Sequence, residues 1–166
     1  MKPIENEVME ILIDNGLTIA TAESCTGGMV SAILINYAGA SQAFINGMCT
    51  YTNESKSRLL DINPDIINTY GAVSSQTAEA MCLGVAKVSN ADIGLSTTGV
   101  AGPDGGTKEK PVGLVYIGVA FKGEVSIKKL MLKGSRNEIR KQSAYEVIQL
   151  LLDVLNKKEI THGKIN

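Results

Sequence analysis

The chain of 166 residues is long enough for one domain with a hydrophobic core, and its 44% apolar content is normal for a globular protein. Its 16 basic residues nearly balance its 17 acidic ones, which argues against a broad nucleic-acid-binding surface because such a surface needs an excess of cations. No apolar run approaches the roughly 20 residues that span a membrane, and the charged start MKPIENEVME lacks a signal-peptide core. We therefore expect a cytoplasmic protein that binds neither nucleic acid nor membranes.

Helix and strand patterns alternate through the first half of the chain. The predicted elements are a helix at 4–14, a strand at 17–22, a helix from Gly27-Gly28 to about Ala38, a strand at 44–52, and short helical segments at about 54–60 and 64–69. In the first helix Ile4, Val8, Ile11 and Leu12 share one face, and Gly16 follows as a stop signal.

The second half continues this alternation. Its predicted elements are a helix from Ser74-Ser75 to about Val88, a strand at 92–98, a glycine-rich loop from Gly99 to Pro111, strands at 112–121 and 124–132, and a last helix beginning at Ser135. Lys122-Gly123 between two apolar segments indicates a hairpin, and Ser135 with Glu138 matches a capping box. The helical residues expected to face inward are Met81, Val85, Val88, Ile139, Val147, Ile148, Leu151 and Leu155.

This order of elements predicts an α/β fold, a three-layer α/β/α sandwich on a mixed, mostly parallel sheet with one antiparallel hairpin strand. We expect a single domain over residues 1–160, followed by a polar tail at 161–166. In such sheets, functional sites form at the carboxyl ends of the strands. Three unusual loops follow predicted strands, at 23–28, 53–56 and 99–111.

Cysteine and histidine usage restricts the chemistry. The three cysteines are widely spaced without a CxxC pattern, so neither a disulfide framework nor a zinc site is indicated. The only histidine, His162, lies in the polar tail. A nucleophile in this chain is therefore expected to use a lysine or a carboxylate as its base rather than a histidine.

Ser24 lies where a predicted strand passes into a predicted helix, in the segment TAESCTGG. A serine at such a turn is exposed beside free helix N–H groups, which stabilise an oxyanion. Gly27 and Gly28 allow a ligand to approach the backbone closely. The alternative is that Ser24 or Thr26 only caps the helix.

Lys56 follows the second predicted strand, in the segment TYTNESK. A lysine serves as a base only where burial or a nearby cation lowers its pKa toward neutrality. Tyr51 and Asn53 are candidate hydrogen-bonding partners beside it. The alternative is a solvated lysine in a short helix, with Tyr51 and Asn53 as ordinary polar residues at a strand end.

The glycine-rich loop GVAGPDGGT is a candidate anion-binding segment, because glycine amides form nests for anions. Its site-forming candidates are Gly99, Gly102, Pro103, Asp104 and Gly105. The loop matches neither a Walker A motif nor GxGxxG. A flexible surface turn is the alternative.

Two further sets of residues leave alternatives open. Arg136 and Arg140 lie one turn apart near the start of the last helix, where cations oppose the helix dipole and a phosphate ligand would explain them. A solvated basic face is the alternative. Cys25 is the rival nucleophile, with Glu23 or Asp104 as a carboxylate partner, or else a small packed residue.

Four ordered blocks, TAESCTGG at 21–28, TYTNESK at 50–56, GAVS at 71–74 and GVAGPDGGT…KPVGLVYIG at 99–118, strongly resemble the CinA C-terminal-domain family. The resemblance extends from about residue 4 to 155. It implies a three-layer α/β/α fold and hydrolysis of nicotinamide mononucleotide to nicotinate mononucleotide and ammonia, in pyridine nucleotide salvage. It also implies that the protein forms a homodimer, binds a small nucleotide as its substrate, and uses no metal or organic cofactor.

The resemblance also implies roles for individual residues. The proposed nucleophile of the family corresponds to Ser24 and its lysine to Lys56, with Tyr51 and Asn53 beside them. Residues expected near the substrate are Cys25, Thr26, Gly27, Gly28, Gly99, Gly102, Pro103, Asp104 and Gly105, with Arg140 or Arg136 pairing with the phosphate. Two alternatives remain, a Cys25-dependent amidase and a non-catalytic nucleotide-binding regulatory module linked to competence and damage response.

Overall fold

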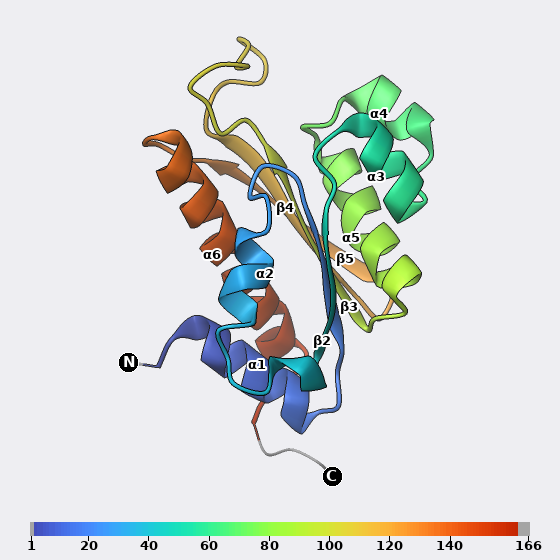
Figure 1. Cartoon of the computed structure of the whole chain (residues 1–166), viewed down its shortest axis with the longest axis vertical. Helices are drawn as coiled ribbons and strands as arrows, with labels where there is room; N and C mark the ends of the chain where they lie inside the picture. The colour runs from blue at the N-terminus through green and yellow to red at the C-terminus, as the bar shows by residue number, and fades with distance from the viewer. Residues whose placement is uncertain (1, 163–166) are drawn as a thin grey trace.

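The computed structural model describes residues 2–162. Its elements are α1 (Ile4–Asp14), β1 (Ile19–Glu23), α2 (Met29–Leu34), the 3-10 helix η1 (Ala40–Gln42), β2 (Phe44–Cys49), α3 (Asn53–Leu60), α4 (Pro64–Tyr70), α5 (Ser75–Ser89), β3 (Ile93–Gly99), β4 (Leu114–Phe121), β5 (Glu124–Met131) and α6 (Arg136–Lys157) (Figure 1). No helix within these residues is long and apolar enough to cross a membrane.

The five strands form one sheet in the order β2-β1-β3-β4-β5. β1 pairs in parallel with both β2 and β3, whereas β4 runs antiparallel to β3 and to β5. β4 is therefore the one reversed strand, as the hairpin signal at Lys122-Gly123 predicted. The mixed α/β sheet is confirmed.

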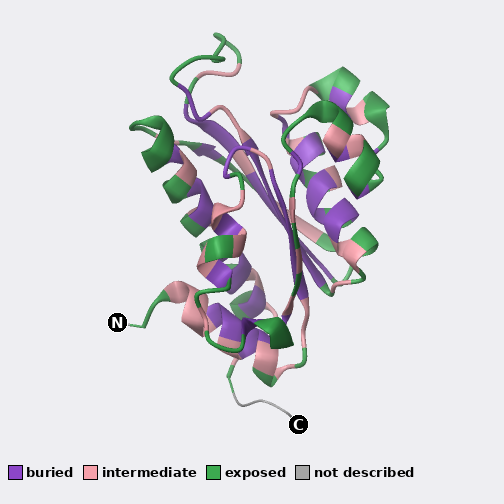
Figure 2. Ribbon diagram, viewed as in Figure 1, coloured by how far each residue is buried: buried purple, intermediate pink, exposed green. Residues whose placement is uncertain are grey.

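Helices cover both faces of the sheet (Figure 1). One core cluster joins residues of α1, α2 and α6 to the strands, and a second joins α3, α4 and α5 to the other face of β1. β1 and the first six residues of β3 are fully buried between these layers, as Figure 2 shows. Because β1, β2 and β3 run parallel, their carboxyl ends lie together at one end of the sheet, which we call its carboxyl edge.

β2 and β5 are less buried than the central strands β1 and β3. Alternate residues of β2 are exposed, and in β5 four of the eight residues are exposed and only Leu130 is buried. Both are edge strands, so each has a neighbour on one side only. Lys128 and Lys129 of β5 fit such an edge, because charged side chains there oppose pairing with another chain.

Helix caps agree with the sequence more closely than helix ends do. Ser74 accepts a hydrogen bond from the Thr77 N–H, and Ser135 and Glu138 form the predicted capping box. All five α6 residues expected to face inward are buried, as are Met81 and Val85, whereas Val88 is 41% exposed and that prediction is wrong. Val88 is the second-to-last residue of α5.

Two predicted elements were too long. α2 ends at Leu34 rather than near Ala38, because the N–H groups of Asn36 and Tyr37 bond carbonyls three residues back and tighten the turn. β2 ends at Cys49 rather than at residue 52, because Thr52 caps α3. The chain therefore leaves β2 early enough to bring Lys56 into the first turn of α3.

The end of the described chain contacts α1. The Thr161 carbonyl accepts a hydrogen bond of 3.2 Å from the Asn15 side chain. The ring nitrogens of His162 lie 3.1 Å from Glu10 and 3.0 Å from Asp14. The rest of the polar tail, 163–166, lies outside the described residues.

Candidate active site

The loops that follow β1, β2 and β3 meet at the carboxyl edge of the sheet, as the positions of the motifs predicted. They surround a hollow of about 200 Å³. Its lining residues are Ser24, Cys25, Tyr51, Lys56, Ala72, Val73, Thr98, Gly99, Ala101 and Arg136. Two candidates for a nucleophile, one candidate base and one arginine therefore share a single small cavity.

Ser24 and Lys56 are in direct contact. The Nζ of Lys56 donates a hydrogen bond of 3.1 Å to the Oγ of Ser24. It also lies 2.9 Å from the Thr50 carbonyl and 3.3 Å from the Tyr51 carbonyl. β2 and its short continuation thus supply the carbonyls that aim the lysine across to the end of β1.

The Lys56 side chain is only 1% exposed, although it starts in an exposed short helix. Burial lowers the pKa of its ammonium, since the charged form loses hydration, while Cys25 and Cys49 oppose this shift more weakly. No carboxylate forms an ion pair with Lys56 within residues 2–162. Burial therefore shifts the equilibrium of Lys56 toward the neutral amine, which is the form that accepts a proton.

The turn after β1 is built around Glu23, whose side chain is 1% exposed. Its carboxylate accepts hydrogen bonds from the N–H groups of Gly28, Val30 and Ser31 and from the hydroxyls of Thr26 and Ser31. The first amides of α2 are thus already bonded to a carboxylate. They do not point at Ser24 as free donors, which differs from the sequence-based expectation for this turn.

The amide that follows Ser24 has a different environment. The N–H of Gly27 bonds back to the Ser24 carbonyl, and the N–H of Ser24 bonds to the Thr97 carbonyl. In the described part of the chain, the Cys25 N–H donates to no other backbone group and to no side-chain oxygen. Cys25 directly follows the serine and lines the hollow, so its amide is a candidate donor for an oxyanion.

Cys25 lines the hollow but is poorly suited to attack. Its side chain is 6% exposed, and burial raises the pKa of the thiol to about 12. The thiolate is the reactive form of cysteine, so this thiol is almost entirely protonated near neutral pH. The three cysteines of the chain are free thiols.

The two arginines of α6 have separate contacts. Arg136 donates to the Gly102 carbonyl at 2.7 Å and to the Tyr51 hydroxyl at 3.0 Å, and it lines the hollow. Arg140 donates to the Cys25 carbonyl at 3.1 Å and to the Thr26 carbonyl at 3.0 Å. Arg136 therefore faces the cavity, while Arg140 holds the turn behind it.

The structure brings some of the predicted site residues together and not others. The predicted residues that line the hollow are Ser24, Cys25, Tyr51, Lys56, Gly99 and Arg136. Those that do not are Thr26, Gly27, Gly28, Asn53, Gly102, Pro103, Asp104, Gly105 and Arg140. Thr26 is fully buried against Glu23 and Thr97, and Asn53 faces a separate depression between α3 and α4.

Four lining residues were not singled out from the sequence: Ala72, Val73, Thr98 and Ala101. Ala72 and Val73 belong to the GAVS block, which marks them only by resemblance. The Thr98 hydroxyl donates to the Ala72 carbonyl at 2.7 Å and so joins this segment to β3. Within residues 2–162, no cluster of His, Cys, Asp or Glu side chains is arranged to hold a metal ion.

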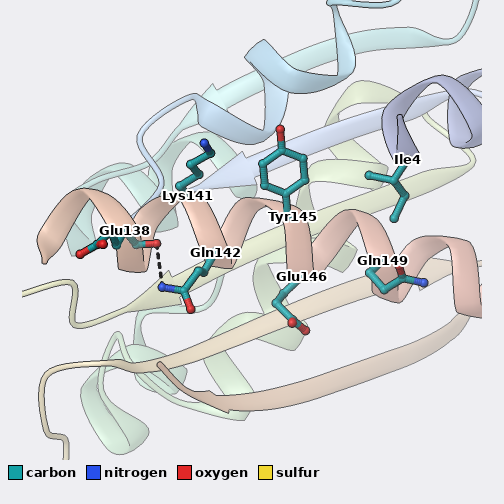
Figure 3. Close-up of a pocket in the computed structure, with 7 residues that line it drawn as sticks. All are labelled: Ile4, Glu138, Lys141, Gln142, Tyr145, Glu146 and Gln149. Carbon is teal, nitrogen blue, oxygen red and sulfur yellow. Dashed lines mark hydrogen bonds between the residues drawn. The ribbon is translucent and has the colours of Figure 1, made fainter. Parts of the chain in front are cut away.

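A larger depression of about 500 Å³ lies elsewhere, along the outer side of α6 (Figure 3). Its lining residues are Ile4, Glu138, Lys141, Gln142, Tyr145, Glu146 and Gln149. Six of these side chains lie along one face of α6 and Ile4 lies on α1, and no nucleophile is paired with a base among them (Figure 3). The smaller hollow at Ser24 is therefore the candidate active site.

This is an α/β/α protein with a mixed sheet, and its candidate site consists of a serine and a buried lysine in contact at the carboxyl edge of that sheet. Residues 1–155 match the CinA C-terminal domain, and the chain belongs to this family. A competence-damage inducible protein from Clostridium beijerinckii is 52% identical over 93% of this chain. A CinA-like protein from Kosmotoga olearia is 50% identical over 85% of it. The chain spans only 38% and 34% of the lengths of these two relatives.

Solved structures agree with this assignment. The competence/damage inducible protein CihA from Agrobacterium tumefaciens has a TM-score of 0.85 at 35% identity, covering 93% of this chain and 97% of that one. A CinA superfamily protein from Klebsiella pneumoniae has a TM-score of 0.89 at 28% identity, with 93% and 96% covered. The fold therefore matches along nearly the whole chain.

Proposed function

We propose that this chain is an amidohydrolase that converts nicotinamide mononucleotide to nicotinate mononucleotide and ammonia, with Ser24 as nucleophile and Lys56 as general base. The observation that carries the proposal is the 3.1 Å contact between the Lys56 Nζ and the Ser24 Oγ. A serine hydroxyl is a weak nucleophile until an adjacent base accepts its proton. Lys56 is within reach, buried and without an ion-pair partner among the described residues.

In the first half of the reaction, the neutral Lys56 amine accepts the Ser24 proton as Oγ attacks the carboxamide carbon. The negative charge that develops on the carboxamide oxygen is stabilised by the Cys25 N–H. Lys56 then returns the proton to the leaving nitrogen, and ammonia departs from an acyl-enzyme ester. The pyridinium of the substrate withdraws electrons from the carboxamide and favours the uncharged form of the nearby lysine.

In the second half, the same lysine accepts a proton from a water molecule that attacks the ester carbonyl. The ester bond to Ser24 breaks, the serine regains its proton from Lys56, and nicotinate mononucleotide is released. One amide and one water thus become one carboxylic acid and one ammonia. The lysine is neutral at the start and at the end, so one base serves both steps.

The position of Arg136 supports a role in binding the 5′-phosphate. Its guanidinium lies at the wall of the hollow, and guanidinium groups bind phosphate with charge-assisted hydrogen bonds. Arg140 does not line the hollow, and it donates to the Cys25 and Thr26 carbonyls. The hollow of about 200 Å³ is smaller than most ligand pockets, so we place the nicotinamide inside it and the phosphate at its rim.

The test is incubation with nicotinamide mononucleotide, followed by chromatography for the acid and an assay for ammonia. Ser24→Ala and Lys56→Met are each expected to remove product formation without unfolding the chain. Full turnover by Ser24→Ala would contradict the serine mechanism. Cys25→Ala separates the cysteine alternative, because turnover persists under the serine mechanism and is lost under the cysteine one.

A second candidate is a nucleotide-binding module without catalysis; the relatives' names refer to competence and damage and name no reaction. It predicts that nicotinamide mononucleotide raises the melting temperature while no acid product forms. The expected homodimer and the cytoplasmic location also stay predictions. Light scattering of the purified chain would test the first, and cell fractionation the second.

A further inference from the structure

The Glu23 carboxylate has an unusual position for a charged group. It is 1% exposed, and its five donors at 2.6–3.0 Å are three backbone amides and two hydroxyls rather than a cation. A buried carboxylate is costly unless its oxygens are fully hydrogen-bonded. Here both oxygens are shared out, with three donors on Oε2 and two on Oε1.

These bonds converge on the segment that carries Ser24. Glu23 is the residue before the serine, and its bonds to Thr26 and Gly28 close the turn on the far side of Ser24. The Thr26 hydroxyl also lies 2.7 Å from the Thr97 hydroxyl of β3. The Ser24 N–H bonds to the Thr97 carbonyl at 3.0 Å. The serine is therefore fixed by its neighbours on both sides and by the adjacent strand.

Arg140 holds the same turn from the side of α6, through the carbonyls of Cys25 and Thr26. Two charged side chains thus hold the turn: the Glu23 carboxylate accepts hydrogen bonds from its N–H groups, and the Arg140 guanidinium donates hydrogen bonds to its C=O groups. Neither side chain is a hydrogen-bond partner of Lys56. Both act on the backbone around Ser24 and on none of the atoms that would react.

We infer that Glu23 is a positioning residue, which fixes the Ser24 hydroxyl beside Lys56 and leaves the Cys25 N–H as the amide that faces the reacting oxygen. This role rests on the proposed function only in taking Ser24 as the nucleophile. Its physical basis is that a misplacement of about 1 Å lowers a rate by about a hundredfold. The carboxylate holds five donors that the neutral side chain of glutamine cannot all satisfy, because its amide N–H₂ faces the Ser31 N–H or the Gly28 and Val30 amides.

The experiment compares Glu23→Gln with Leu151→Ala, a control that removes core packing from the middle of α6. For Glu23→Gln we expect kcat on nicotinamide mononucleotide to fall about 30- to 100-fold with KM within about threefold. We expect the pH at which kcat is half-maximal to be unchanged, because Glu23 does not contact Lys56. Leu151→Ala is expected to lower the melting temperature with kcat near that of the unchanged chain. Equal kcat values for folded Glu23→Gln and Leu151→Ala would overturn the inference.

A second readout does not depend on the identity of the substrate. A fluorophosphonate reagent phosphonylates activated serines with loss of fluoride, and labelling is followed at Ser24 by mass spectrometry. Glu23→Gln is expected to slow labelling at least tenfold relative to the unchanged chain, and an unchanged rate overturns the inference. If the unchanged chain is labelled but does not hydrolyse nicotinamide mononucleotide, the proposed function fails while the role of Glu23 stands.

A milder variant covers the case in which Glu23→Gln does not fold. Thr26→Val removes one of the five donors, the hydroxyl 2.6 Å from Glu23, with little change of shape. We expect it to fold and to slow both kcat and labelling about three- to tenfold. Rates equal to those of the unchanged chain would show that the turn does not depend on this network, and would overturn the inference.

Discussion

Two glycine-containing segments leave the same edge of the sheet and differ in almost every other respect. The turn Glu23–Gly28 after β1 is largely buried and is bonded through its side chains and backbone to α2, β3 and α6. The loop after β3 is exposed from residue 103 to 109. Its hydrogen bonds to other parts of the molecule include one of 2.7 Å from the Lys110 Nζ to the Tyr70 carbonyl and one of 2.7 Å from Arg136 to the Gly102 carbonyl.

Glycine content alone therefore does not define a binding segment. In the turn, Gly28 has a φ of 102°, which lets the chain place its N–H on Glu23 while α2 begins. A Cβ at Gly27 of the turn would lie 3.2 Å from the Arg140 guanidinium, whereas a Cβ at Gly105 of the loop, which also has a positive φ of 84°, would meet nothing within 4 Å. The conformation of the turn is thus fixed by its contacts with Glu23 and Arg140, whereas the loop after β3 only connects two antiparallel strands.

The largest effect is expected at Lys56, which contacts Ser24 of the buried turn. Lys56→Met keeps the apolar stem and removes the base, so we expect kcat on nicotinamide mononucleotide to fall by about 10² to 10⁴. The measurement is steady-state ammonia release with circular dichroism as the folding control. A loss of less than about tenfold would mean that another group accepts the serine proton.

The second effect is on stability and compares the two segments directly. Glu23→Ala strips five donors of their acceptor, so we expect the free energy of unfolding to fall by about 3 kcal/mol or more. Urea denaturation followed by circular dichroism measures it. A loss below about 1 kcal/mol would show that water replaces the carboxylate, and the turn would no longer differ from the loop in this respect.

The third effect separates the two arginines. Arg136→Ala is expected to raise KM for nicotinamide mononucleotide about tenfold with little change in kcat, because a phosphate contact at the rim binds substrate and transition state alike. Arg140→Ala is expected to lower kcat instead, because it releases the Cys25 and Thr26 carbonyls. Initial rates over a range of substrate concentrations distinguish the two outcomes, and the reverse pattern would exchange their assigned roles.

The fourth effect is the pH dependence of stability that Lys56 imposes. Because the pKa of Lys56 is lowered in the folded chain, the unfolded chain binds more protons between that value and 10.5, and this contribution to stability rises with pH. The slope stays below about 1.4 kcal/mol per pH unit for one proton. Subtracting the urea-unfolding free energies of Lys56→Met at matched pH isolates it. A difference that falls as pH rises would mean that the folded state prefers the ammonium.

The smallest effect is expected in the exposed loop. Asp104→Ala changes a solvent-exposed carboxylate that lies outside the hollow, so we expect the free energy of unfolding to change by no more than about 0.5 kcal/mol. Urea denaturation beside Glu23→Ala supplies the contrast. A loss comparable to that of Glu23→Ala would remove the distinction between the two segments.

The sequence predicted the order of elements and the meeting of the three loops, because both follow from local patterns and from the geometry of parallel strands. Ser24 and Lys56 could be brought together in this way, since each follows a strand that ends at the same edge. The capping box at Ser135 was equally readable, because its two residues are close in sequence.

Contacts between distant side chains could not be predicted in the same way. Arg140 lies 115 residues from Cys25, and no spacing rule indicates that its guanidinium bonds the carbonyls of the turn rather than a phosphate. Glu23 was weighed only as a partner for a cysteine, because an acidic residue at the end of a strand usually faces solvent. Its burial depends on the short helix α2 starting with its N–H groups toward the carboxylate.

The reversal of β4 has a consequence for how this protein can vary. Because β4 runs antiparallel to β3, the loop between them begins and ends at the same end of the sheet. Two hydrogen bonds join the two ends of this loop, from the Val100 N–H to the Leu114 carbonyl and from the Gly113 N–H to the Val100 carbonyl. Because these hydrogen bonds hold the two ends of the loop together, the loop can gain or lose residues without shifting the register of β3 and β4. Length changes and grafted peptides are therefore best accommodated there, next to the rim of the hollow, where they would alter what reaches Ser24 while the core keeps its packing.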